Sequence, residues 1–265
     1  MSTNHEVRLV VFDWAGTTVD FGCFAPVDAF VRTFAHHGIA VTPAEVRVAM
    51  GLHKKDHLHA LLRQPEVSQR WKRTAGRTWN EKDLEALYNT FIPIQLETVA
   101  EHAQIVPGLL ECVEALRRRD IRIGATTGYF RAAAERVYDA ARRQGFVPDC
   151  ALCADDVSLG RPAPWMIFRI METVGVYPPC TVVKVGDTVP DIEEGRNAGA
   201  WSVGVTRSSS AVGCTEEELA ALSEPQRQAK LDDARRQFLD ARAHAVIDAL
   251  ADLPSLVDQF SRANA

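Results

Sequence analysis

One stretch near the N-terminus decides the fold: Val7-Arg8-Leu9-Val10-Val11-Phe12-Asp13-Trp14-Ala15-Gly16-Thr17-Thr18. Its first six residues are mainly apolar and β-branched, which is typical of a buried strand. We expect the strand to end at Asp13, because Gly16-Thr17-Thr18 is a loop signal. Residues 25 to 99 contain no convincing strand pattern. An all-helical block is therefore predicted directly after the first strand.

Helical and strand patterns divide the rest of the chain into two regions. Within the block, helices are expected over residues 26–37, 42–50 and 54–62 and after Asn80. Further strands are expected over residues 121–125, 150–153, 181–185, 201–205 and 243–247. Between and after them, helices are expected over residues 109–119, 132–143, 164–174 and 192–198, in the charged tail of 214–243, and from about 254. This alternation predicts an α/β fold, a doubly wound parallel sheet with an inserted helical cap domain. The core is expected to comprise residues 1–22 and 100–265, and the cap residues 23–99.

Composition excludes several classes of protein. The 265 residues, 46% hydrophobic, suit one large or two modest domains. Lys and Arg number 30 against 35 Asp and Glu, so the net charge of -5 argues against a nucleic-acid surface. No apolar run reaches the roughly 20 residues of a membrane span, and the polar start at residues 1–7 is unlike a secretory signal. The six cysteines are expected to be reduced thiols of a cytoplasmic protein.

Reactive-looking residues follow three of the expected strands. Ligands bind at the carboxyl ends of strands in open α/β sheets, so these residues are expected to converge. Asp13 and Asp187 carry carboxylates suited to a shared Mg²⁺ ion. Thr127, Gly128 and Arg161 offer hydrogen-bond donors to phosphoryl oxygens. Neither a G-x-x-x-x-G-K-[ST] nor a G-x-G-x-x-G nucleotide loop occurs.

The order of these residues resembles the four motifs of the haloacid dehalogenase superfamily. The matching positions are Asp13, Thr127, Arg161, Gly186-Asp187 and Asp191. Over nearly the whole chain the sequence is similar to the phosphonatase (phosphonoacetaldehyde hydrolase) family of that superfamily. This similarity rests on residues 12–22, 50–57, 126–129 and 160–166.

The resemblance implies a set of site residues and partners. Asp13 would be the nucleophile and would form an aspartyl phosphate. One Mg²⁺ per subunit would be held by Asp13, the carbonyl of Ala15 and Asp187, with support from Asp191. Lys54 of the cap would form a Schiff base with an aldehyde substrate. No organic cofactor, a small phosphonate as substrate and a homodimer are expected.

Ala15 and Lys54 together favour one reaction. Superfamily phosphatases and mutases resemble one another in a second Asp two residues after the nucleophile, where this chain has Ala15. Loss of that general acid would slow ester hydrolysis by about 10²- to 10⁴-fold. An iminium on Lys54 makes the acid unnecessary, because C–P cleavage then releases an enamine. Only about one ordinary lysine in 2,500 is neutral at pH 7, so we expect the domain interface and Mg²⁺ to lower the pKa of Lys54.

The residues around Lys54 are expected to assist it. If residues 50–57 are helical, Met50 and His57 share one face with Lys54. His57 would then relay protons, and Met50 would form a wall of the site. The sequence assigns no role to His53 or Lys55, and it does not identify the residue that activates the hydrolytic water.

The predicted activity is therefore hydrolysis of phosphonoacetaldehyde to acetaldehyde and phosphate. A Mg²⁺-dependent sugar-phosphate phosphatase or phosphomutase of the same superfamily is the alternative, and Ala15 argues against it. A non-catalytic protein that binds a phosphate ligand is the third hypothesis. The presence of Asp13, Lys54 and Asp187 argues against that one.

Overall fold

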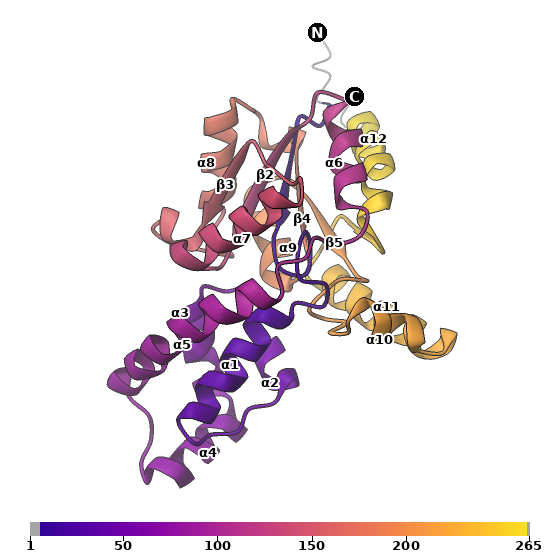
Figure 1. Cartoon of the computed structure of the whole chain (residues 1–265). Coiled ribbons are helices and arrows are strands. Elements are labelled where there is room, and N and C mark those ends of the chain that lie inside the picture. The colour runs from indigo at the N-terminus through magenta and orange to yellow at the C-terminus, as the bar shows by residue number, and fades with distance from the viewer. Residues whose placement is uncertain (1–5, 264–265) are drawn as a thin grey trace.

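A six-stranded parallel sheet forms the centre of the chain in the computed structural model, which describes residues 6–263 (Figure 1). The polar start at residues 1–5 lies outside them. The strands are β1 (Leu9–Asp13), β2 (Arg122–Thr127), β3 (Cys150–Cys153), β4 (Val182–Gly186), β5 (Trp201–Val205) and β6 (Ala245–Ile247). Their order is β3-β2-β1-β4-β5-β6, so the winding direction reverses between β1 and β4. The predicted doubly wound α/β core is confirmed, and its switch point places a ligand site beyond the ends of β1 and β4.

Helices cover both faces of this sheet, as buried parallel strands require. They are α6 (Leu109–Arg117), α7 (Arg131–Arg143), α8 (Trp165–Val174), α9 (Val189–Asn197), α11 (Glu224–Asp240) and α12 (Leu253–Ala263), and α10 (Glu216–Ala221) packs against α9 and α11. Short 3₁₀ helices cover Ala154–Asp156, Pro179–Thr181 and Leu250–Asp252. Val10 and Phe12 of β1 belong to the core formed with α6, α7 and α12, whereas Leu9 and Val11 pack with α8. Alternate residues of β1 therefore anchor opposite layers.

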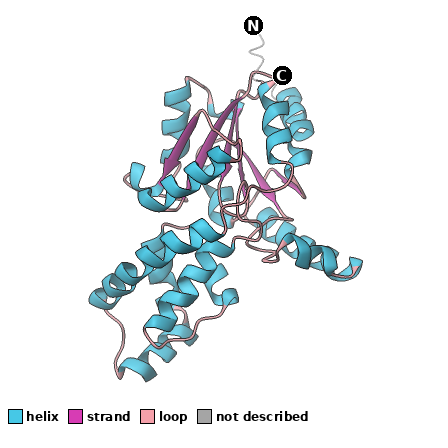
Figure 2. Cartoon of the chain, viewed as in Figure 1, coloured by secondary structure: helices cyan, strands magenta, loops and turns pink. Residues whose placement is uncertain are grey.

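Five helices lie between β1 and β2 and form a separate lobe beyond the sheet (Figure 2). They are α1 (Phe24–His36), α2 (Pro43–Arg47), α3 (Lys54–Arg63), α4 (Pro65–Ala75) and α5 (Glu81–Glu101). The helical block is as predicted, and α5 packs along α1. The domain bounds at 23 and 99 stay a proposal. The sequence analysis missed α4, whose buried residues are only Val67 and Trp71, a weak apolar pattern.

The predicted helix over residues 42–50 is shorter than expected. α2 ends at Arg47, and Met50 and Gly51 lie in a turn in which Gly51 has φ +93°. α3 begins only at Lys54, so the prediction that Met50 shares a helical face with Lys54 is wrong. A glycine at 51 favours this turn, because its backbone enters the left-handed region without steric cost.

Two other predictions can be compared with the described part of the chain. No disulfide joins the six cysteines in this part of the chain, as expected. Within residues 6–263 we find no helix with the length and apolar character of a membrane span.

Candidate active site

Asp13 occupies the end of the central strand β1, between the ends of β2 and β4. Its side chain is buried, and the Thr18 hydroxyl donates to its carbonyl oxygen at 3.0 Å. The following loop turns at Gly16, which has φ +89°. A Cβ at Gly16 would lie 2.3 Å from Oδ2 of Asp187. Only glycine therefore lets the two acidic loops approach this closely.

Three carboxylates meet at this point. Oxygens of Asp13, Asp187 and Asp191 lie within 4.8 Å of one another. Burial, with repulsion from Asp191, raises the pKa of Asp13 to about 6. Burial, with repulsion from both neighbours, raises the pKa of Asp187 well above its ordinary value. Oδ1 of Asp187 is buried without a hydrogen-bond partner among the described residues. An unpartnered oxygen in a trio of carboxylates fits a hard divalent cation.

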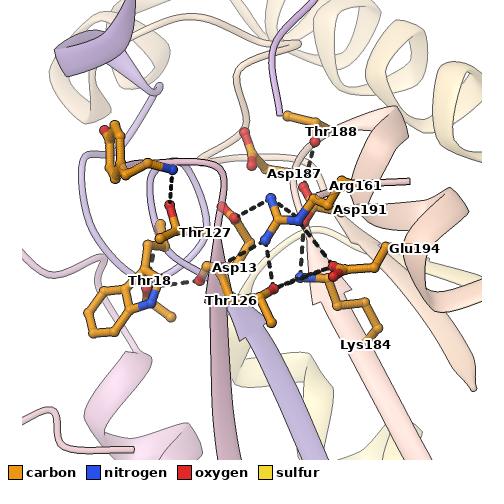
Figure 3. Close-up of polar contacts among 12 residues, drawn as sticks. Asp13, Thr18, Thr126, Thr127, Arg161, Lys184, Asp187, Thr188, Asp191 and Glu194 are labelled. Carbon is orange, nitrogen blue, oxygen red and sulfur yellow. Dashed lines mark hydrogen bonds and ion pairs between the residues drawn. The ribbon is translucent and has the colours of Figure 1, made fainter. Parts of the chain in front are cut away.

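Arg161 lies at the centre of this acidic group (Figure 3). Its Nη1 contacts Oδ1 of Asp13 at 2.7 Å and Oδ1 of Asp191 at 2.9 Å. Its Nε donates to Glu194 at 3.0 Å, and its Nη2 donates to the carbonyl and hydroxyl oxygens of Thr126 at 2.8 and 2.7 Å. These contacts occupy the whole guanidinium edge. In this arrangement Arg161 orients the carboxylate of Asp13, and its predicted contact with phosphoryl oxygens stays a prediction.

The sequence analysis did not predict the buried lysine that lies beneath the site. Lys184 of β4 is fully buried, and its Nζ lies 3.0 Å from Asp191, 3.3 Å from Glu194 and 2.8 Å from the Thr126 hydroxyl. The available signal was a lysine within the apolar strand 182–186, because a buried lysine needs an anionic partner.

The formal charges of this cluster do not cancel. Burial favours a higher pKa for Asp191, but Arg161 and Lys184 together hold its pKa below the ordinary value. Among residues 6–263 the cluster contains four carboxylates against two cations, a formal charge of -2. The carboxylates are Asp13, Asp187, Asp191 and Glu194, and the cations are Arg161 and Lys184. One divalent cation would neutralise it.

Lys54 reaches the acidic site from the cap. It is the first residue of α3 and is only 4% exposed. Its Nζ lies 4.9 Å from the ring centre of Tyr129 and 5.9 Å from that of Phe30. Burial lowers the pKa of Lys54, as expected for an amine at the domain interface.

A cavity of about 20 Å³ joins the cap and core residues. Most residues predicted for the site line it: Asp13, Ala15, Met50, Lys54, Thr127, Gly128, Arg161 and Asp187. Asp191 lies beside them through its contact with Arg161. The lining also includes Cys23, Tyr129 and Thr188, for which the sequence predicted no contact with the substrate. The volume suits about one water molecule, so a larger ligand would require the cap to move.

The remaining polar residues near Lys54 lie away from this cavity. His57 is fully buried against Phe30 and is not part of the lining. Its Nε2 lies 2.7 Å from the Val46 carbonyl, so this nitrogen carries the proton. Burial, reinforced by the charge of Lys54, lowers the pKa of His57 to about 3. The imidazole is therefore neutral at physiological pH.

The roles of His53 and Lys55 follow from their contacts. Nδ1 of His53 accepts from the backbone N–H of Lys55 at 3.3 Å and so caps α3. The Lys55 ammonium pairs with Glu85 of α5. Both side chains thus hold α3 in place, and Lys54 is the first residue of this helix.

Comparisons with known proteins agree with this geometry. The family model described as haloacid dehalogenase-like hydrolase matches residues 7–199. The phosphonoacetaldehyde hydrolase of Syntrophobacter fumaroxidans is 44% identical over 96% of this chain and 92% of its own length. That of Bacillus cereus is 40% identical over 97% of both chains.

Solved structures show the same relationship. The chain superposes with a TM-score of 0.96 on a phosphonoacetaldehyde hydrolase-like protein from Oleispira antarctica, at 39% identity over 98% of this chain and 94% of the other. A β-phosphoglucomutase from Clostridium difficile, at 15% identity over 97% and 98% of the two chains, shares the fold with a TM-score of 0.67. The nearly full-length similarity at about 40% identity covers core, cap and the residues of the acidic site. The chain is therefore an enzyme that belongs to the phosphonoacetaldehyde hydrolase family of the haloacid dehalogenase-like hydrolases.

Proposed function

We propose that the protein cleaves the C–P bond of phosphonoacetaldehyde and releases acetaldehyde and phosphate. The observation that carries the proposal is a buried cap amine, Lys54, in one cavity with the carboxylate of Asp13. Ala15 stands where a phosphatase of the superfamily would need an acid. The relatives at 40–44% identity carry the name of this activity, which supports it.

Lys54 begins the reaction. Its neutral Nζ adds to the aldehyde carbon, and loss of water gives a protonated imine. A lowered pKa enlarges the fraction of amine that is neutral and so able to attack. The positive nitrogen is the electron sink that makes the adjacent carbon a leaving group.

Asp13 then attacks phosphorus. As the new O–P bond forms, the C–P bond breaks and its electron pair moves into an enamine on Lys54. Protonation at carbon and hydrolysis of the resulting imine release acetaldehyde and regenerate the amine. Water hydrolyses the aspartyl phosphate, which releases phosphate and restores Asp13.

The acidic group fits Mg²⁺, with Asp13, Asp187 and the carbonyl of Ala15 as ligands and Asp191 in support. When bound, Mg²⁺ offsets the repulsion between the nucleophile and the phosphonate. Thr127 and Gly128 are proposed to bind phosphoryl oxygens. Arg161 would share this task by exchanging one of its present hydrogen bonds for a phosphoryl oxygen.

Three further assignments belong to the same proposal. Met50 forms a wall of the site. His57 belongs to α3 and lies outside the cavity as a neutral imidazole, and its relay of protons during imine formation stays a proposal. A cytoplasmic homodimer remains our expectation for the assembly.

A phosphatase or phosphomutase of the same superfamily remains the alternative activity. The β-phosphoglucomutase that shares the fold does so at only 15% identity, which carries no argument about the substrate. Normal turnover of phosphate esters by the protein would favour the alternative.

Trapping of the imine tests the proposal. The protein is incubated with phosphonoacetaldehyde and borohydride, and peptides are analysed by mass spectrometry. We expect loss of activity and a reduced two-carbon adduct on Lys54, with no adduct on the exposed Lys72. Release of phosphate without any adduct would reject the imine mechanism.

A further inference from the structure

The loop after β5, residues 206–214, contacts both acidic loops of the site. Its serines Ser208, Ser209 and Ser210 are buried. The Ser208 hydroxyl donates to the carbonyl of Gly16 at 2.7 Å. The backbone N–H of Ser210 donates to Oδ2 of Asp187 at 2.8 Å. This loop, which we call the serine loop, therefore fixes one oxygen of Asp187 and leaves its unpartnered Oδ1 beside the other carboxylates.

Arg47 of the cap reaches the same loop. It is the last residue of α2, and its Nη1 lies 3.0 Å from the carbonyl and 3.1 Å from the hydroxyl of Ser210. The same Nη1 donates to the carbonyl of Gly22, at the connection between core and cap, at 2.8 Å. One guanidinium thus joins cap, connection and core through charge-assisted hydrogen bonds.

The side chain of Arg47 is closely packed against neighbouring residues. Its guanidinium lies 5.3 Å from the ring centre of Phe24. A Cβ at Gly213 would lie 2.9 Å from Nε of Arg47, and Gly213 has φ +61°. A side chain at position 213 would therefore displace Arg47. These contacts distinguish Arg47 from the exposed arginines of the cap.

We propose that Arg47 is a positioning residue that couples closure of the cap to the orientation of Asp187 through Ser210. Its contacts with Ser210 and Gly22 exist together only while α2 rests against the core. In that position Lys54 is buried beside Asp13 and the serine loop is held against Asp187. A single movement of the cap therefore positions both the amine of Lys54 and the carboxylates of the acidic group. The mechanistic meaning of this coupling rests on the proposed function, but its structural consequences do not.

A cleft beside these contacts indicates what happens when they break. It has a volume of about 340 Å³ and is lined by both domains, including Arg47, Ser210 and Gln237. It shares Met50, Asp187 and Thr188 with the 20 Å³ cavity that holds Lys54. Loss of the Arg47 contacts would let this solvent-facing cleft extend to Lys54.

Chemical labelling of Lys54 tests the first half of the proposal. Wild-type, R47A, R47K and R73A proteins are treated with trace acetic anhydride, and acetylation of Lys54 is measured relative to Lys72. Loss of a charge-assisted hydrogen bond shifts an equilibrium by about tenfold or more, so R47A should label Lys54 at least tenfold faster. R47K should fall between R47A and wild type, and R73A should match wild type because Arg73 is an exposed cap residue. No phosphonate is present, so the result is independent of the proposed reaction.

Binding of Mn²⁺, followed by electron paramagnetic resonance, tests the second half. R47A should bind Mn²⁺ about fivefold more weakly than wild type, the size of a modest coupling between sites. R47K should recover part of the affinity, and R73A should bind as wild type does. Unchanged labelling of Lys54 in R47A or R47K would overturn the role in closure. Faster labelling with unchanged Mn²⁺ affinity would overturn the coupling to Asp187.

Discussion

Replacement of Lys54 by methionine should make the protein more stable while it removes the activity. Methionine keeps most of the side-chain volume of lysine and has no charge. Burial lowers the pKa of Lys54 in the folded protein, whereas the unfolded chain has the ordinary pKa of a lysine. The folded state therefore binds fewer protons than the unfolded state between these two pKa values.

The sign and size of the effect follow from proton linkage. Above the unfolded pKa, Lys54 is neutral in both states and contributes no pH dependence. As pH falls below it, protonation stabilises the unfolded state, and the wild type loses up to about 1.4 kcal/mol per pH unit until the folded pKa is reached. Lys54→Met lacks this loss. The stability difference between variant and wild type should therefore grow as pH falls below the ordinary pKa of a lysine and become constant below the lowered pKa of the folded state.

Urea unfolding at several pH values measures this difference. Lys72→Met, at an exposed position of α4, is the control and should show no such slope. A flat difference, or a variant that loses stability as pH falls, would refute the argument that Lys54 is held with a lowered pKa. Turnover of phosphonoacetaldehyde by Lys54→Met should fall by about 10³-fold or more, because no imine forms.

Three further substitutions test the core side of the site. Ala15→Asp should raise hydrolysis of a phosphate ester by up to about 10²-fold, since it restores a general acid beside the leaving oxygen; unchanged ester turnover in a folded variant would count against that reading. Lys184→Met should lower the free energy of unfolding by about 3–5 kcal/mol, because the buried Asp191 and Glu194 would then share Arg161 as their cation. The double variant with Glu194→Gln should recover part of this loss in urea titrations, and no recovery would contradict the pairing. Gly16→Ala should weaken Mn²⁺ binding by about tenfold or more, because a Cβ would meet Asp187; wild-type affinity would show that the loops tolerate it.

The sequence predicted most of the residues that line the small cavity, because a parallel sheet brings the ends of its strands to one edge. A buried strand that ends in Asp13 and another that ends in Gly186-Asp187 must meet at one edge of a parallel sheet. We could therefore predict that the side chains at these ends share one site, although the sequence gives no distances. The same reasoning found Thr127 and Gly128 after β2, and all four line the cavity.

Features that depend on side-chain packing were not predictable in this way. Lys184 lies within β4 and not at its end, so position along the strand gave no indication of its contact with Asp191. Ser210 reaches Asp187 through its backbone N–H, which every residue except proline has. The helical face assigned to Met50 was wrong because Gly51 turns the chain before α3 begins.

The cap determines the chemistry of this enzyme through electrostatics as well as contact. The core alone carries a formal charge of -2 at its acidic cluster, an environment that would raise the pKa of a nearby lysine and keep it protonated. Burial of the amine lowers its pKa instead. In the folded protein the effect of burial is larger than the effect of the acidic cluster, so the pKa of Lys54 is lowered. That burial depends on the packing of α3 against the core, where the shared cavity measures about 20 Å³. The closure that excludes water therefore also increases the neutral fraction of Lys54, whereas an open cap would expose the amine to reagents with the ordinary pKa of a lysine.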